Sequence, residues 1–140
     1  MTPRLLQLDS SYEQYQVYGM IMEIGVKGGT ATLVTYIDGN ASIYFSTGGG
    51  VIGGFAHDNV REKAISFVKS APEFLSSMVQ INEYLSPREG NVTFNALTRE
   101  GIFTVTAKEK ELQEKAASIW PLYYMGQDVI TQLRLIGGNK

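Results

Sequence analysis

The sequence predicts an α+β domain in which a twisted antiparallel sheet of four or five strands is flanked by three helices, in the order α-β-β-α-β-β-α. Two pairs of strand-like segments, each joined by a short turn containing glycine, predict the hairpins of this sheet. Stretches with apolar residues three and four positions apart predict the helices. The length of 140 residues suits a single domain, 1–140, with one core.

The first helix is expected at residues 11–26. Ser10 and Glu13 have the spacing of a capping box, and apolar residues follow at helical intervals: Val17, Ile21 and Ile24. Two glycines inside the stretch weaken this interpretation. An alternation of four apolar residues would also fit a strand: Met20, Met22, Ile24 and Val26.

The first hairpin is the clearest strand signal in the chain. Residues 30–37 are rich in β-branched side chains and run into Asp38-Gly39, and residues 41–46 form the returning strand. Aspartate followed by glycine favours a two-residue type I′ turn, because that turn needs positive φ at both central positions.

The second helix is predicted to begin at Asn59, which lies three residues before Glu62. Its apolar stripe comprises Val60, Ala64, Phe67, Val68 and Ala71. Pro72 removes a backbone donor and should kink or break the helix. Residues 73–85 are expected to continue as a helix, although residues 78–84 would also fit a strand.

The second half of the chain predicts another hairpin and a final helix. Residues 92–97 and 102–107 have strand character and are separated by a short turn. Residues 108–135 have helical periodicity, and Pro121 and Gly126 should bend or split this helix.

A glycine-rich segment separates the first hairpin from the second helix. Residues 48–54 contain five of the fifteen glycines of the chain: Gly48, Gly49, Gly50, Gly53 and Gly54. They match the pattern G-x-G-x-x-G. The dinucleotide fingerprint, however, requires a parallel strand-helix-strand unit, and here the preceding strand belongs to a hairpin. The segment is therefore predicted to be a turned or mobile connection, an anion-binding loop or a contact between chains.

The anion-binding alternative includes the start of the second helix. Glycine backbone N–H groups and a helix N-terminus can bind one anion together. His57, Asp58 and Arg61 lie where the glycine-rich segment meets that helix, and two of them could add donors. The predicted ligand-binding residues are thus these three and the five glycines, with a small anionic or phosphate-bearing group as the ligand.

Composition excludes several classes of function. The net charge of −2 and the pI near 5.4 give no electrostatic basis for binding nucleic acid or an anionic membrane. The chain has no cysteine, which excludes disulfides and thiolate catalysis. Neither an export signal nor a membrane-spanning stretch is evident, so a cytoplasmic location is expected.

No catalytic constellation is recognisable. A histidine-based triad would have to use His57, the single histidine, and no G-x-S-x-G elbow supplies a serine. No carboxylate cluster predicts a metal site, and no cofactor is expected. The residues therefore favour a non-enzymatic function.

The predicted order of elements resembles the roadblock/dynein-light-chain group of the profilin-like folds. The resemblance covers most of the chain, although such domains have three strands in the second half. It implies pairing into homodimers and a role as a scaffold or regulator, often of small GTPases. The leading hypothesis is thus a homodimeric interaction or regulatory module with a possible protein partner. The alternative is a small-ligand binding protein or enzyme that uses the glycine-rich segment.

Overall fold

The computed structural model describes residues 17–53 and 57–137 of the chain. Four strands come first: β1 (Val17–Val26), β2 (Gly29–Tyr36), β3 (Ala41–Phe45) and β4 (Gly50–Gly53). Then follow the helix α1 (Asp58–Ser70), the 3₁₀ helix η3 (Ala71–Ser77) and the short strand β5 (Val79–Ile81). The chain continues with β6 (Asn91–Thr98), β7 (Gly101–Lys108), α2 (Glu109–Gln113) and α3 (Trp120–Ile136).

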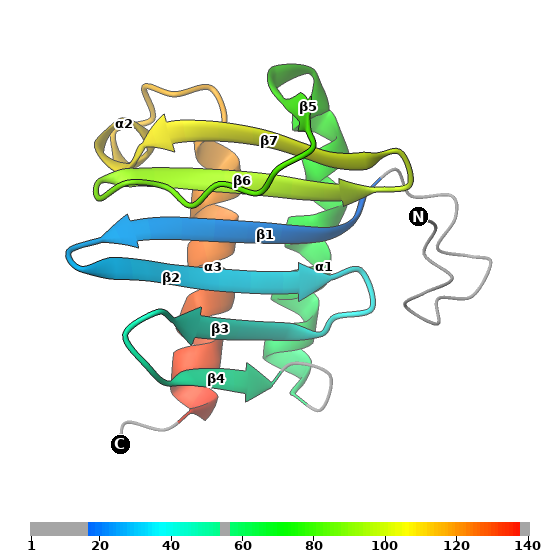
Figure 1. Ribbon diagram of the computed structural model, residues 1–140. Helices are drawn as coiled ribbons and strands as arrows, with labels where there is room; N and C mark the ends of the chain where they lie inside the picture. Colours follow the sequence, from blue (N-terminus) through cyan, green and yellow to red (C-terminus); the bar gives the residue numbers. More distant parts are fainter. Residues whose placement is uncertain (1–16, 54–56, 138–140) are drawn as a thin grey trace.

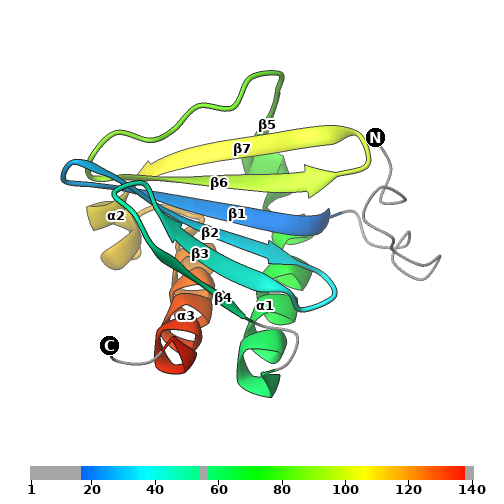
Figure 2. The same cartoon turned by 60° about the horizontal axis from the view of Figure 1, so that its bottom comes forward.

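The strands form one antiparallel sheet in the order β4-β3-β2-β1-β6-β7-β5. Helices α1 and α3 pack against each other and against one face of this sheet (Figure 1). Turning the molecule shows both helices on the same side, which makes two layers (Figure 2). We call the face that these helices do not cover the open face.

The predicted fold class is wrong in the number of strands and in the order of elements. The sheet has seven strands instead of four or five, and four of them precede the first described helix. Strand β1 occupies most of the segment predicted as the first helix, and residues 11–16 of that helix lie outside the described residues. The order of elements that carried the resemblance to the roadblock group is therefore not that of the structure.

The position of β1 explains why its sequence pattern misled. It is the middle strand of the sheet, and Met20, Met22 and Ile24 are buried beneath the helices. Ile21 and Glu23 point to the open face, so apolar residues occur on both sides of the strand. A strand that is apolar on both faces also satisfies helical spacing.

The core lies between the sheet and the two long helices. Cross-strand register places Met22 opposite both Leu33 and Phe94 on the helix-facing side, and all three are fully buried. Helix α3 approaches the sheet closely at Gly126, where a Cβ atom would lie 2.6 Å from the Met22 sulfur. Only glycine allows this approach without displacement of Met22. The predicted stripe of the second helix is confirmed as buried: Val60, Ala64, Phe67, Val68 and Ala71.

Both predicted hairpins are confirmed, β2–β3 and β6–β7. The type I′ turn is wrong, because Gly39 has a positive φ of 97° whereas Asp38 does not. The Gly39 N–H donates to the Tyr36 carbonyl (2.9 Å), and the Tyr36 N–H donates to the Asn40 carbonyl (3.0 Å). The loop is thus one turn followed by a left-handed glycine, a longer hairpin connection.

The two later helix predictions need correction. The break at Pro72 is confirmed, but the chain continues as η3 and then as β5, so residues 73–85 are not an α-helix. The final helix is split before Pro121, between α2 and α3. The split includes Lys115, which has a positive φ of 60° and ends α2 in a left-handed conformation.

A strap, residues 82–90, crosses the open face from the end of β5 to the start of β6 (Figure 1). Its end is fixed by a hydrogen bond from the Gly90 N–H to the Gly25 carbonyl (3.0 Å). Between the helices on one side and the strap on the other, residues 92–96 of β6 are all buried. None of the described helices is long and apolar enough to cross a membrane.

Candidate functional site

The glycine-rich segment forms a hairpin in place of a single loop. Gly48 and Gly49 lie at its tip with positive φ angles of 121° and 85°, which favour glycine. The Gly48 N–H donates to the Phe45 carbonyl (2.9 Å), and the Phe45 N–H donates to the Gly49 carbonyl (3.1 Å). The tip is therefore a closed turn, and its geometry alone explains these two glycines.

The glycines at the two ends of β4 serve close packing. A Cβ atom on Gly50 would collide with the Ile43 carbonyl and lie 3.2 Å from the Tyr44 Cα. A Cβ atom on Gly53 would collide with the side chain of Ile136 at the end of α3. Gly54 lies outside the described residues.

The predicted ligand-binding residues fall into two separate groups. His57, Asp58 and Arg61 lie together at the start of α1. Gly48 and Gly49 lie beyond the far end of β4, about 10 Å or more away at a rise of roughly 3.3 Å per strand residue. The structure does not bring these two groups into one anion cradle, and the anion site stays a prediction.

Arg61 is also engaged locally. Its Nη2 atom forms an ion pair with Asp58 Oδ1 at 2.9 Å, and its side chain packs over Gly39. The Asp58 carboxylate brings negative charge to the N-terminus of α1, where an anion would bind. These contacts leave Arg61 with a structural role at the β2–β3 turn.

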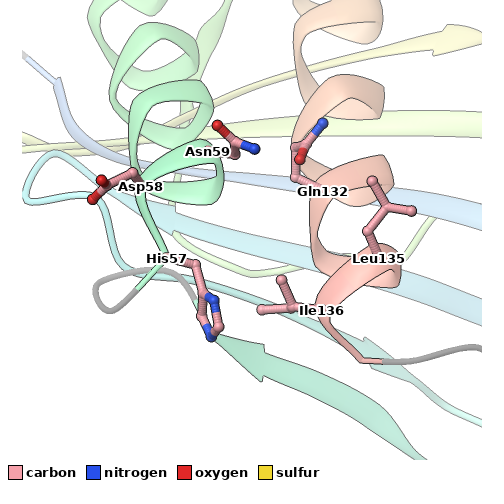
Figure 3. A pocket seen from close by; sticks show the side chains of 6 residues that line it. All are labelled: His57, Asp58, Asn59, Gln132, Leu135 and Ile136. Carbon is pink, nitrogen blue, oxygen red and sulfur yellow. The ribbon is translucent and has the colours of Figure 1, made fainter.

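A cleft of about 410 Å³ lies between the start of α1 and the end of α3 (Figure 3). It is lined by His57, Asp58, Asn59, Gln132, Leu135 and Ile136. His57 makes no capping hydrogen bond. The described residues contain no group of three or more histidine, aspartate or glutamate side chains placed to hold a metal ion. The cleft is a mixed polar and apolar depression beside β4.

The free edge of β4 is the feature that sequence reasoning missed. The Phe45–Gly49 pair is hydrogen-bonded, and such pairs alternate along an antiparallel ladder. The backbone N–H and C=O groups of Gly50 and Ile52 therefore point outward, away from β3. These groups have no strand partner among the described residues.

The sequence at this edge also lacks the charged residues that usually discourage pairing with another chain. Exposed edge strands generally carry lysine, proline, a bulge or other charged residues. Residues 40–57 contain no Asp, Glu, Lys or Arg, in a chain with 19% charged residues overall. Such a long uncharged run is the sequence signal from which this edge could have been found.

Exposed apolar side chains lie beside the edge on the open face and at the cleft between α1 and α3. Ile52 is 77% exposed on the open face, next to the exposed ring of Tyr44. On the helix side, exposed Leu135 lies at the cleft (Figure 3). The β4 edge, defined as β4 with these three side chains, therefore combines unpaired backbone groups with apolar surface.

Comparison of the chain with protein-family models, with curated proteins and with solved structures finds no match.

Proposed function

We propose that the protein is a non-enzymatic interaction module that forms a homodimer through the β4 edge. The observation that carries the proposal is the outward-facing, uncharged backbone of β4, with exposed Ile52 and Tyr44 beside it on the open face. An edge of this kind is a template for a further strand.

The second copy would add its own β4 in antiparallel orientation about a two-fold axis. Such an interface is isologous, so the same residues of each copy meet. The outward N–H and C=O groups of Gly50 and Ile52 would then gain partners, and the two sheets would become continuous. A four-residue strand supplies only a few hydrogen bonds, each worth about 0.5–1.5 kcal/mol net.

The apolar surface beside the strand must therefore contribute most of the stability. A stable interface buries roughly 1,200–2,000 Å² in total, more than two short strands provide. Ile52 and Tyr44 extend the contact surface on the open face, and Leu135 adds apolar surface at the cleft between α1 and α3. The adjoining cleft gives the partner's apolar side chains a depression to occupy.

Light scattering coupled to size-exclusion chromatography tests this proposal with a matched pair of variants. Ile52→Lys places a charge on the β4 edge, and Val79→Lys places the same charge on β5, where the side chain is 66% exposed. We expect the wild type and Val79→Lys to have the mass of a dimer at micromolar concentrations, and Ile52→Lys that of a monomer.

Either of two results contradicts the proposal. The first is a wild-type chain that stays monomeric at every accessible concentration, which means that no homodimer forms. A dimer that survives Ile52→Lys but dissociates with Val79→Lys uses the other edge of the sheet.

A further inference from the structure

A buried carboxylate lies at the centre of the open face. Glu23 is on the middle strand β1 and is only 5% exposed. Its Oε2 atom accepts a hydrogen bond from the Thr32 hydroxyl (3.0 Å), and its Oε1 atom accepts one from the Tyr84 hydroxyl of the strap (2.8 Å). No lysine, arginine or histidine of the described residues forms an ion pair with Glu23.

Two neutral donors leave this carboxylate poorly compensated. An ionised carboxylate has room for about four hydrogen bonds, and a buried one is normally paired with a cation. Burial, followed by the hydrogen bond to Glu23 and its charge, raises the pKa of Tyr84 far above its usual value. Tyr84 therefore remains a neutral hydrogen-bond donor at any physiological pH, and it does not neutralise the charge of Glu23.

An unused hydrogen-bond donor lies beside Glu23. Asn95 is 1% exposed, and its Nδ2 atom has no hydrogen-bond partner. Glu23 pairs with Thr93 and Ile21 pairs with Asn95 across β1 and β6, so Asn95 is a diagonal neighbour of Glu23 on the open face. Diagonal neighbours lie about 7 Å apart, within the span of one small molecule.

The hydroxyl groups around Asn95 do not satisfy it. The Thr93 and Thr106 hydroxyls lie 2.8 Å apart and hydrogen-bond to each other. A buried donor that lacks an acceptor destabilises the folded state, so a ligand that supplied an acceptor would recover that free energy.

The strap is held over this site by few interactions. Residues 82–87 form no backbone hydrogen bond with the sheet among the described residues. The Tyr84 hydroxyl connects them to Glu23 through its hydrogen bond. Leu85 is 68% exposed, so displacement of the strap would uncover little buried apolar surface from this side chain. The interactions that must break for a ligand to reach Glu23 are thus concentrated in Tyr84.

We propose that Glu23 and Asn95 form a binding site for a small organic cation that also carries a carbonyl group. The cation, an ammonium or guanidinium, takes the place of the Tyr84 hydroxyl on the Glu23 carboxylate. The carbonyl oxygen accepts a hydrogen bond from the Asn95 amide. A charge-assisted hydrogen bond is roughly twice as strong as a neutral one, which favours the exchange.

Titration of the full-length chain with N-acetyl-lysine methylamide, followed by amide NMR, tests this site. The probe has an ammonium and two carbonyl groups, and N-acetyl-norleucine methylamide is its uncharged counterpart. We expect saturable shifts of the Asn95 side-chain amide and of the strap with the lysine probe, and none with the norleucine probe.

Three variants locate the effect. Glu23→Gln should abolish the saturable shifts. Tyr84→Phe removes the competing donor, so affinity should increase about three- to tenfold, the equivalent of one neutral hydrogen bond. Tyr124→Phe is the matched control, because the Tyr124 hydroxyl donates to the Gln113 carbonyl (2.8 Å), away from Glu23, and its loss should leave affinity unchanged.

The proposal fails if the lysine probe gives no saturable shift at millimolar concentration, or if the norleucine probe binds equally well. It also fails if Tyr84→Phe weakens binding or if folded Glu23→Gln binds as the wild type does. Should Glu23→Gln not fold, the two probes and Tyr84→Phe still decide the outcome.

Discussion

The two edge strands of the sheet differ in how far the chain protects them. Strand β5 has three residues and leads directly into the strap, which turns back over the open face. The Gln80 amide of β5 donates to the Glu100 carbonyl (2.6 Å), and charged residues follow in the strap. Strand β4 has four residues within an uncharged run of eighteen, residues 40–57.

This difference separates an edge that ends the sheet from an edge that can extend it. A very short edge strand with polar ties offers little for another chain to pair with. The β4 edge offers outward backbone groups and exposed apolar side chains on the open face. Exposed apolar residues occur at both edges, so exposure alone would not have distinguished them.

The largest effect is expected from a methyl group added to one glycine near each edge. Gly50→Ala forces a Cβ atom against the Ile43 carbonyl, and overpacking of this kind costs about 1–3 kcal/mol. Gly101→Ala, near β5, is strained by a φ of 129°, at a similar cost of about 1–3 kcal/mol. Urea unfolding should show both losses.

The dependence of the unfolding midpoint on protein concentration should then distinguish the two glycine variants. A dimer unfolds at a higher midpoint when the protein is more concentrated, because association stabilises only the folded state. We expect this dependence in Gly101→Ala and its loss in Gly50→Ala. The same dependence in both variants would contradict a special role for the β4 edge.

A smaller effect should appear in amide hydrogen exchange at the two edges. The Ile52 N–H points outward, so we expect its exchange to slow by about tenfold or more as protein concentration rises and the partner strand covers it. Exchange at Val79 and Gln80 should not depend on concentration. Mass spectrometry or NMR can compare both sites in one sample. Equal protection from exchange at the two edges would contradict the proposed difference between β4 and β5.

Alkaline pH should weaken the half of the molecule that contains β7, α2 and α3. Burial, followed by the hydrogen bond from the Tyr123 hydroxyl to Glu109 (2.7 Å), raises the pKa of Tyr123 to about 12 from 10.0. The unfolded chain therefore loses this proton first, and stability falls as the pH rises from 10 towards 12. Tyr123→Phe should reduce that fall in denaturant unfolding at successive pH values, whereas an unchanged fall would assign it to other groups.

The smallest effect is expected at Lys115. Its backbone is left-handed, a conformation that only glycines adopt elsewhere among the described residues. Its Nζ atom lies 4.7 Å from the centre of the Trp120 ring, a cation–π contact worth about 0.5–1 kcal/mol. Lys115→Gly loses that contact but relieves backbone strain of about 1–2 kcal/mol, so stability should change little. Lys115→Ala loses the contact and keeps the strain. In thermal unfolding, the melting temperature of Lys115→Ala should be lower than that of Lys115→Gly. The reverse order would exclude backbone strain at this residue.

Local sequence patterns predicted the elements whose two faces differ. The stripe of α1 and both hairpins have one apolar side, and the predictions for them are confirmed. Strand β1 is buried on both faces, so its pattern favours a helix at residues 11–26 and also fits the strand that the structure has. Strand β4 was missed because it is short and two of its four residues are glycines, which have low strand propensity.

The two proposed sites depend on contacts that no local pattern contains. Glu23 and Tyr84 are separated by 61 positions and meet only because the strap crosses the sheet. The free edge of β4 depends on which strand ends the sheet, and this is set by the pairing of β1 with β6. Of the predicted ligand-binding residues, sequence reasoning correctly grouped His57, Asp58 and Arg61, which are close in the chain, but it could not separate them from Gly48 and Gly49.

The central position of β1 also has a consequence for biosynthesis. The β1–β4 meander leaves the ribosome before β6, the other neighbour of β1, whose residues follow their partners in β1 by about seventy to eighty positions. Until then the nascent meander has two unpaired edges, β1 and β4, and α3, which packs against Met22 of β1, is made later still. Late closure between distant segments slows folding, and unpaired apolar strands promote aggregation. We therefore expect fragments that end before Asn91 to aggregate, and production of the complete chain to benefit from slow translation or chaperones.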